Sequence, residues 1–136
     1  MKSPVIALLT MSACLTSTAL YAQQPAPAAW PTQPIRLIVS QSAGGSIDIA
    51  ARLIGQELSN AIGAAVDGDN KAGANGLTAG EAAARATDGH TFLMTSPSTL
   101  TINQHVYKSM PYDTARDFPP VTQTTSIASL LLVNAN

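Results

Sequence analysis

One segment limits the possible folds more than any other, because a strand pattern, a glycine loop and a helix pattern follow one another between residues 35 and 62. Residues 35–39 (IRLIV) are β-branched and nearly all apolar, which is typical of a strand covered on both faces in a parallel sheet. The small residues of 40–45 (SQSAGG) then predict a loop. Beyond Ser46, apolar residues recur at helical spacing up to Gly63, which suits a helix end. The residues that set this spacing are Ala50, Leu53, Ile54, Leu58, Ala61 and Ile62.

Weaker patterns after this segment predict that strands and helices continue to alternate. The expected elements are a short strand at 64–66, a loop at 67–76, a helix at 77–86, a strand at 91–95, a short helix at 100–107 and a strand at 126–133. Such alternation indicates an α/β domain with a mainly parallel sheet and flanking helices. A chain of 136 residues has room for one small domain of this kind.

The N-terminus has the pattern of a secretory signal peptide. Lys2 precedes an apolar stretch at 5–20, and Ala22 ends a small-residue junction, so we expect residues 1–22 to be cleaved. Serines and threonines dilute the stretch too much for a membrane anchor. Residues 23–33 are then a flexible leader rich in proline and alanine, and residues 34–136 form the α/β domain.

Cys14 is the only cysteine and lies inside the predicted signal peptide. We expect it to be discarded with that peptide, which leaves a mature protein without thiol chemistry. The alternative is that residues 11–14 (MSAC) form a lipobox and that Cys14 becomes a lipid anchor.

The charge and histidine content argues against several classes of partner. The formal net charge is −1 and only 11% of residues are charged, without blocks of either sign, so no nucleic-acid partner is expected. His90 and His105 have no cysteine or carboxylate at ligand spacing, so no metal is expected. The glycine loop matches neither a P-loop nor a dinucleotide fingerprint, and no cofactor is predicted.

Ligands of open α/β sheets bind at the carboxyl ends of the strands, where two loops here carry suitable groups. In the first loop, small residues expose backbone N–H groups at a helix start; in the second, at 95–99, several hydroxyls are clustered. Together they suit a small carboxylate. The candidate ligand-binding residues are Ala43, Gly44, Gly45, Ser46, Asp48, Ser96, Ser98 and Thr99. The alternatives are that the glycines only form a turn and that Asp48 only stabilises its helix.

No catalytic residue is assigned from the sequence. The serines at 96 and 98 lack a G-x-S-x-G motif, and neither candidate loop contains a histidine. A secreted hydrolase using Asp48 with Ser96 or Ser98 is retained as an alternative function, and an inactive truncated product as another.

Six segments in order across 107 of the 136 residues resemble the first lobe of the Bug family. They are WPTQPIRLIV, AGGSIDIAARLIGQEL, DNKAGANG, EAAARATDGHTFLM, INQHVYKSMPYDTARDFPPV and LLVN. Bug proteins are the periplasmic solute-binding proteins of tripartite tricarboxylate transporters. The resemblance implies a two-lobed Venus flytrap that closes on a small carboxylate and passes it to a membrane permease. It also implies that residues 43–46, Asp48 and residues 96–99 hold the ligand carboxylate, partly through ordered water.

The chain departs from the family pattern in three respects. Ser40 and Gln41 stand where the family usually has proline and an aromatic residue, so one apolar wall of the pocket is expected to be missing. Residues 64–68 (AAVDG) weaken the family's second strand, and Ala72 replaces a proline. Family members are more than twice this long, so we expect the second lobe to be missing and the chain to be a truncated form.

Overall fold

The computed structural model describes residues 29–127 and 132–134. Contacts divide the chain into two units, Met1–Thr32 and Gln33–Asn136, and the described helices and strands all lie in the second. The predicted signal peptide, much of the predicted leader and residues 128–131 lie outside the described residues.

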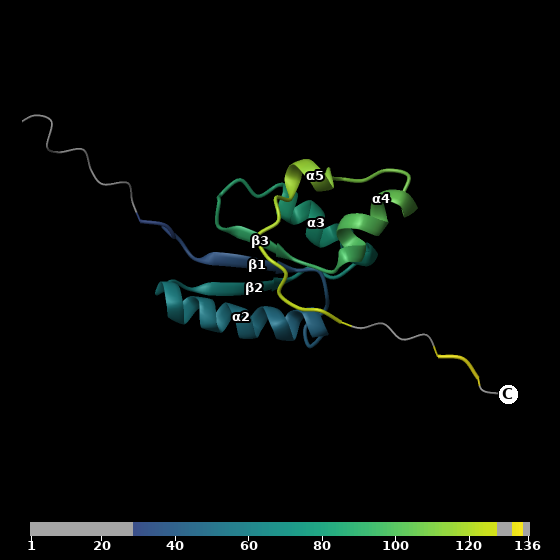
Figure 1. The fold of residues 1–136 in the computed structure, drawn as a ribbon. Coiled ribbons are helices and arrows are strands. Elements are labelled where there is room, and N and C mark those ends of the chain that lie inside the picture. The colour runs from purple at the N-terminus through teal and green to yellow at the C-terminus, as the bar shows by residue number, and fades with distance from the viewer. Residues whose placement is uncertain (1–28, 128–131, 135–136) are drawn as a thin grey trace, which may run out of the picture. The chain divides into compact units, whose positions relative to one another are not determined.

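Three parallel strands form the sheet of the second unit (Figure 1). They are β1 (Ile35–Val39), β2 (Val66–Asn70) and β3 (Thr91–Met94), in the order β2-β1-β3. The register places Leu37 of β1 opposite Gly68 of β2 and Phe92 of β3. Strand β1 is central, with a strand on each side and a helix over each face, and four of its five residues are buried. The predicted α/β class and parallel sheet are confirmed.

Helices cover both faces of this sheet (Figure 1). Helix α2 (Ser46–Ile62) lies on one face, and α3 (Leu77–Ala84), α4 (Asn103–Val106) and α5 (Thr114–Asp117) lie on the other. The core beneath α2 joins Val39, Ala51 and Met94, one residue from each of two strands and one from the helix.

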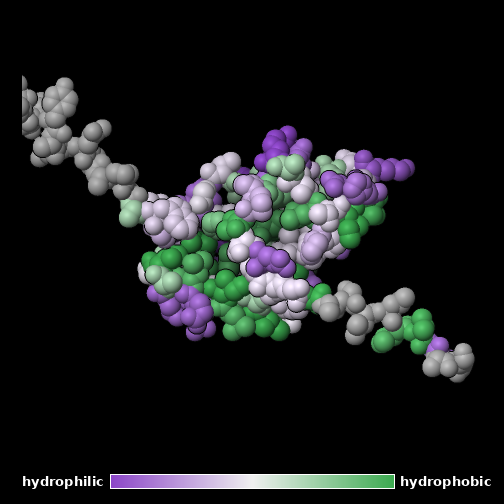
Figure 2. All heavy atoms as spheres, in the orientation of Figure 1, coloured by the Kyte–Doolittle hydropathy of each residue, from purple (hydrophilic) through white to green (hydrophobic). Residues whose placement is uncertain are grey.

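Helix α2 has the predicted bounds but packs with an unexpected side. It ends at Gly63, whose φ of 67° is the left-handed conformation that favours glycine at this position. Its buried residues are Asp48, Ala51 and Gly55. Gly55 has no Cβ, and this lets the helix approach Val66 of β2 closely. Two members of the apolar repeat, Leu53 and Ile54, are exposed, and apolar atoms gather over α2 in Figure 2.

Strand β2 corrects the sequence prediction of a strand at 64–66 followed by a loop from 67. The strand occupies residues 66–70 and pairs with β1 over its whole length. Two aspartates and a glycine are poor strand formers, but β2 lies at the sheet edge, where exposed polar side chains are tolerated. The ladder extends further, because Lys71 N donates to Val39 O at 2.8 Å.

The remaining predicted elements differ from the structure mainly at their ends. Helix α3 and strand β3 begin where predicted and stop two residues and one residue early, respectively. The short helix predicted at 100–107 is a π-helical turn at Ser98–Ile102 that continues into α4. Helix α5 was not predicted; Asp113 caps it by accepting from two backbone N–H groups. The described parts of the predicted last strand, 126–127 and 132–133, form no strand.

Within the described ranges, no helix combines the length and the apolar character needed to span a membrane.

Candidate functional site

Three loops meet at the carboxyl edge of the sheet, because all three strands run in the same direction. They follow β1, β2 and β3, and they enclose an open pocket of about 250 Å³. The lining residues are Ser40, Gln41, Ser42, Ala72, Gly73, Ala74, Asn75, Gly76, Ser96 and Thr99. All of them are uncharged, so polar and backbone groups dominate this site.

The structure brings only some of the predicted site residues to this pocket. Ser96 and Thr99 line it, and Ser98 lies beside Ser96 with their Oγ atoms 2.6 Å apart. Ala43, Gly44, Gly45, Ser46 and Asp48 are not among the lining residues.

Sequence reasoning missed the loop after β2, and it placed Ser40 and Gln41 at a pocket wall without naming them as ligand-binding residues. Residues 72–76 reach the pocket because β2 ends at Asn70, at the same edge as the other strands. The available signal was the glycine-rich composition of KAGANG, but it points to a ligand loop only once β2 is assigned its true end.

A chain of hydroxyls joins the β1 and β3 loops inside the site. Thr95 Oγ1 lies 2.8 Å from Ser40 Oγ and 2.7 Å from Thr99 Oγ1. Thr99 in turn donates to the carbonyl oxygen of Asn75 at 3.2 Å. Because a hydroxyl has one proton, Thr95 donates to only one of its two neighbours. These linked hydroxyls therefore hold the three loops together and leave oxygen lone pairs at the pocket wall.

The loop after β2 is held in an uncommon backbone conformation. Ala74 and Asn75 have φ values of 45° and 52°, a backbone conformation that residues other than glycine rarely adopt. Asn103, fully buried, stabilises this turn by exchanging two hydrogen bonds with Asn75, of 2.7 and 3.0 Å. Gly76 then packs directly on Thr99, and a Cβ there would collide with Thr99 Oγ1. The turn is thus built to fit against the β3 loop.

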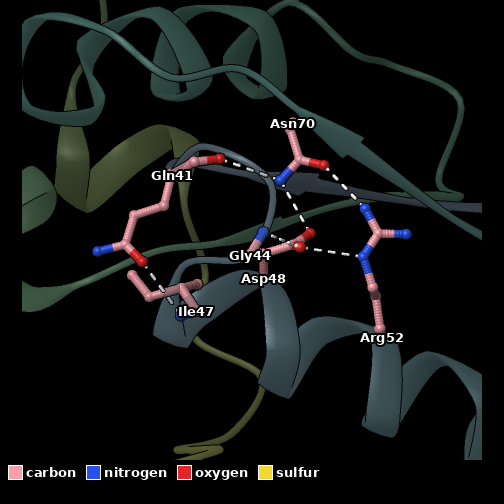
Figure 3. A network of polar contacts seen from close by, with 6 residues as sticks. All are labelled: Gln41, Gly44, Ile47, Asp48, Arg52 and Asn70. Atoms are coloured by element: carbon pink, nitrogen blue, oxygen red, sulfur yellow. Dashed lines mark hydrogen bonds and ion pairs between the residues drawn. The ribbon is translucent and has the colours of Figure 1, made fainter.

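Asp48 is not a lining residue of the pocket but anchors the glycine loop through the hydrogen bonds drawn in Figure 3. Its Oδ2 atom accepts from Gly44 N at 2.8 Å and from Arg52 Nε at 3.0 Å, and its Oδ1 accepts from Asn70 Nδ2 at 2.9 Å. The side chain is only 2% exposed. These contacts use both carboxylate oxygens and tie the β1 loop to α2 and to the end of β2.

This network keeps Asp48 ionised. Hydrogen bonds from Arg52, Gly44 and Asn70, in decreasing order of effect, lower the pKa of Asp48 from 3.8 to about 2. A carboxylate with so low a pKa is a weak general base, because it holds its proton poorly at neutral pH.

Known proteins with similar sequences decide the family. The sequence model described as the tripartite tricarboxylate transporter family receptor matches residues 50–136. A UPF0065 protein of Bordetella bronchiseptica is 40% identical over 107 residues, which are 78% of this chain and 32% of that protein. Protein BugT of Bordetella pertussis is 33% identical over 129 residues, 93% of this chain and 40% of BugT. The chain belongs to the tripartite tricarboxylate transporter receptor family.

Solved structures agree with the family and with the fold. A structure described as Rhodopseudomonas palustris Rpa4515 with adipate is 40% identical, with a TM-score of 0.64 over 68% of this chain and 31% of that one. MatC from R. palustris with bound malate is 30% identical, with a TM-score of 0.63 over 68% and 32% of the two chains. The chain therefore spans about a third of the length of the B. bronchiseptica relative and of these two structures.

Within this receptor family member, the described residues offer little for catalysis or metal binding. Among them, no histidine or carboxylate lines the pocket beside Ser96. His90 is buried at the start of β3, at the opposite edge of the sheet, where its Nδ1 lies 2.8 Å from the carbonyl oxygen of Asp88. The described part of the chain also contains no group of three or more histidine, cysteine or acidic side chains placed to bind a metal ion.

Proposed function

We propose that this chain supplies the first lobe of a periplasmic receptor that binds a small carboxylate and delivers it to a tripartite tricarboxylate-type membrane permease. The observation that carries the proposal is the three-loop pocket, which has neutral polar walls and lies at the carboxyl edge of a parallel sheet. The adipate and malate named with two related structures support a small carboxylate as the ligand class. Binding without catalysis fits two features of the described residues. Both carboxylate oxygens of Asp48 are engaged in structural hydrogen bonds, and no histidine or carboxylate lines the pocket beside Ser96.

Neutral donors suit a carboxylate that must later be released. A hydrogen bond to a charged acceptor contributes about 1.5–3 kcal/mol without the desolvation of a buried ion pair. Ser96 and the backbone at residues 73–75 supply such donors in the pocket. Of the predicted site residues, Ser96 keeps a ligand-binding role in this proposal, Ser98 positions the Ser96 hydroxyl, and Thr99 forms part of the pocket wall. Ala43, Gly44, Gly45, Ser46 and Asp48 are proposed to position the β1 loop.

One lobe alone binds weakly under this proposal. A pocket of about 250 Å³ that is open to solvent covers less of a ligand than sites that bury most of its surface. We therefore expect a dissociation constant in the range of about 1 mM, which corresponds to about 4 kcal/mol.

Titration of the protein with malate and with adipate tests the proposed binding. The Ser96→Ala variant should weaken binding about tenfold, because one hydrogen bond to a charged oxygen is lost. The matched Ser109→Ala variant removes an exposed serine hydroxyl away from the pocket and should bind as the wild type does. Equal affinities in all three proteins would contradict the placement of the site, and an absence of carboxylate binding would contradict the function.

Export through a cleaved signal peptide is part of the same proposal. Residues 1–22 lie outside the described residues, so the support is the sequence pattern of Lys2, the apolar stretch and Ala22. Expression of the whole chain in a Gram-negative host should give a periplasmic protein that begins at Gln23. N-terminal sequencing checks this, and a mature protein beginning at a lipidated Cys14 would replace it with the anchored alternative.

A further inference from the structure

The Gln41 side chain is held in one orientation at the pocket wall. Its Oε1 atom accepts a hydrogen bond of 3.1 Å from the backbone N–H of Ile47, in the first turn of α2. An N–H donor must face the carbonyl oxygen of an amide, so this contact fixes which end of the carboxamide is which. The nitrogen end points away from the other residues drawn in Figure 3.

The backbone of Gln41 is fixed as firmly as its side chain. Its carbonyl oxygen accepts from Asn70 Nδ2 at 3.0 Å, and Asn70 is held by Asp48 and by Arg52 Nη2 at 3.1 Å (Figure 3). Gly45 supplies the space that the carboxamide needs, because a Cβ there would lie 2.7 Å from Gln41 Oε1. The glycine of this loop therefore accommodates Gln41.

The Nε2 group of Gln41 retains both of its protons for another partner. In the part of the chain that the structure describes, no acceptor receives a hydrogen bond from it, although Gln41 is half-buried and lines the pocket. Of the neighbouring polar groups, the Asn75 amide donates to Asn103, and the Ser96 and Ser98 hydroxyls share one hydrogen bond, which leaves one of their two protons for a ligand. A donor that is fixed in place before binding loses little conformational entropy when a ligand arrives.

We propose that Gln41 determines specificity by donating from Nε2 to a second oxygen-bearing group of the ligand. The site then selects small carboxylates that carry a further acceptor, either a hydroxyl or a second carboxylate, over alkyl carboxylates of the same length. An alkyl end leaves the carboxamide without a partner, and sites built around a hydrogen bond discriminate against analogues that lack it. This inference rests on the proposed carboxylate-binding function.

Three four-carbon probes that differ only at one end test the inference: succinate, 4-hydroxybutyrate and butyrate. The protein purified after expression of the whole chain should bind the first two about five- to tenfold more tightly than butyrate. Gln41→Met keeps the length of the side chain and removes both donors, so the preference should fall below twofold. Gln56→Met makes the same change on α2, outside the pocket, and should keep the wild-type preference.

A second variant separates loss of the donor from loss of the loop structure. Gln41→Glu keeps an oxygen for the Ile47 N–H and replaces Nε2 by a charged acceptor, so the loop should persist while the preference for succinate over butyrate disappears. Wild-type selectivity in both Gln41 variants would overturn the inference and leave the proposed function standing. If none of the three probes binds the wild-type protein, the proposed function fails, and this inference fails with it.

Discussion

At the residue scale, Asp48 shows how a side chain can determine a site without touching it. Its two oxygens accept from a loop amide, an arginine on the same helix and an asparagine on a neighbouring strand. An acidic residue in a first helical turn was expected to face either the ligand or the helix N-terminus. The partner at Asn70, 22 positions away, could not be foreseen because it depends on where β2 ends.

The low pKa of Asp48 makes folding stability depend on pH. The pKa is about 2 in the folded state and 3.8 ordinarily, so the folded protein binds this proton less readily. The stabilisation is fully present above about pH 4 and is lost as the pH falls through about 2. Urea unfolding between pH 7 and pH 2 should show this loss in the wild type. Asp48→Asn should be less stable at pH 7 and should lack this part of the pH dependence.

The matched control for Asp48 is Asp67→Asn on β2. The Asp67 carboxylate is exposed and has no hydrogen-bond or ion-pair partner among the described residues. This variant should keep the wild-type acid profile. Equal profiles in the Asp48 and Asp67 variants would show that the network of Figure 3 does not stabilise the fold.

Two glycines with similar backbone conformations should respond differently to alanine. Gly63 has a φ of 67° and open space around its Cα, so Gly63→Ala should cost about 1 kcal/mol from backbone strain alone. Gly76 has a φ of 86° and packs on Thr99, so Gly76→Ala adds a steric collision and should cost about 3 kcal/mol. Denaturant unfolding of both variants measures the difference. Equal costs would argue against the close packing of Gly76 on Thr99.

At the element scale, local sequence predicted the elements whose residues agree with their surroundings. Strand β1 and helix α2 have the predicted bounds, because the first is apolar and β-branched and the second ends at a glycine in the left-handed conformation. Strand β2 (VDGDN) could not be predicted beyond Val66, because pairing with β1 outweighs its poor strand propensity. The pocket loop at 72–76 was missed for the same reason, since its position depends on the end of β2.

Strand β2 also leaves space beneath α2 that a larger residue should fill. Gly68 lies opposite Leu37, and a Cβ there would meet no atom within 4 Å. Gly68 borders a groove of about 340 Å³ between α2 and the sheet. Gly68→Val should raise stability by about 1–2 kcal/mol through apolar burial and reduced backbone entropy.

Thermal unfolding measures this gain, with Asp67→Val as the matched control. That change brings valine to the neighbouring, exposed position of the same strand, so it adds strand propensity without filling the groove. An equal gain in both variants would show that the groove is not filled by the new side chain at position 68.

At the scale of the whole molecule, the chain corresponds to about a third of the length of its B. bronchiseptica relative and carries three complete loops of one pocket. The order of the sheet places the loops after β2 and β3 on either side of the loop after β1. The sequence segments that resemble the Bug family could indicate this architecture, but the hydroxyl chain and the reciprocal Asn75–Asn103 contact required coordinates. The parallel sheet therefore explains why residues far apart in the sequence share one site.

The most direct test maps which backbone amides respond when a small carboxylate is added. Malate should be titrated into the isotopically labelled protein while amide chemical shifts are followed. We expect saturable shifts at residues 40–42, 72–76, 96, 98 and 99, with little change at Gln56, Ser59 and Asn60 in the groove beneath α2. Shifts confined to that groove, or no saturable shifts in the three loops, would contradict the account.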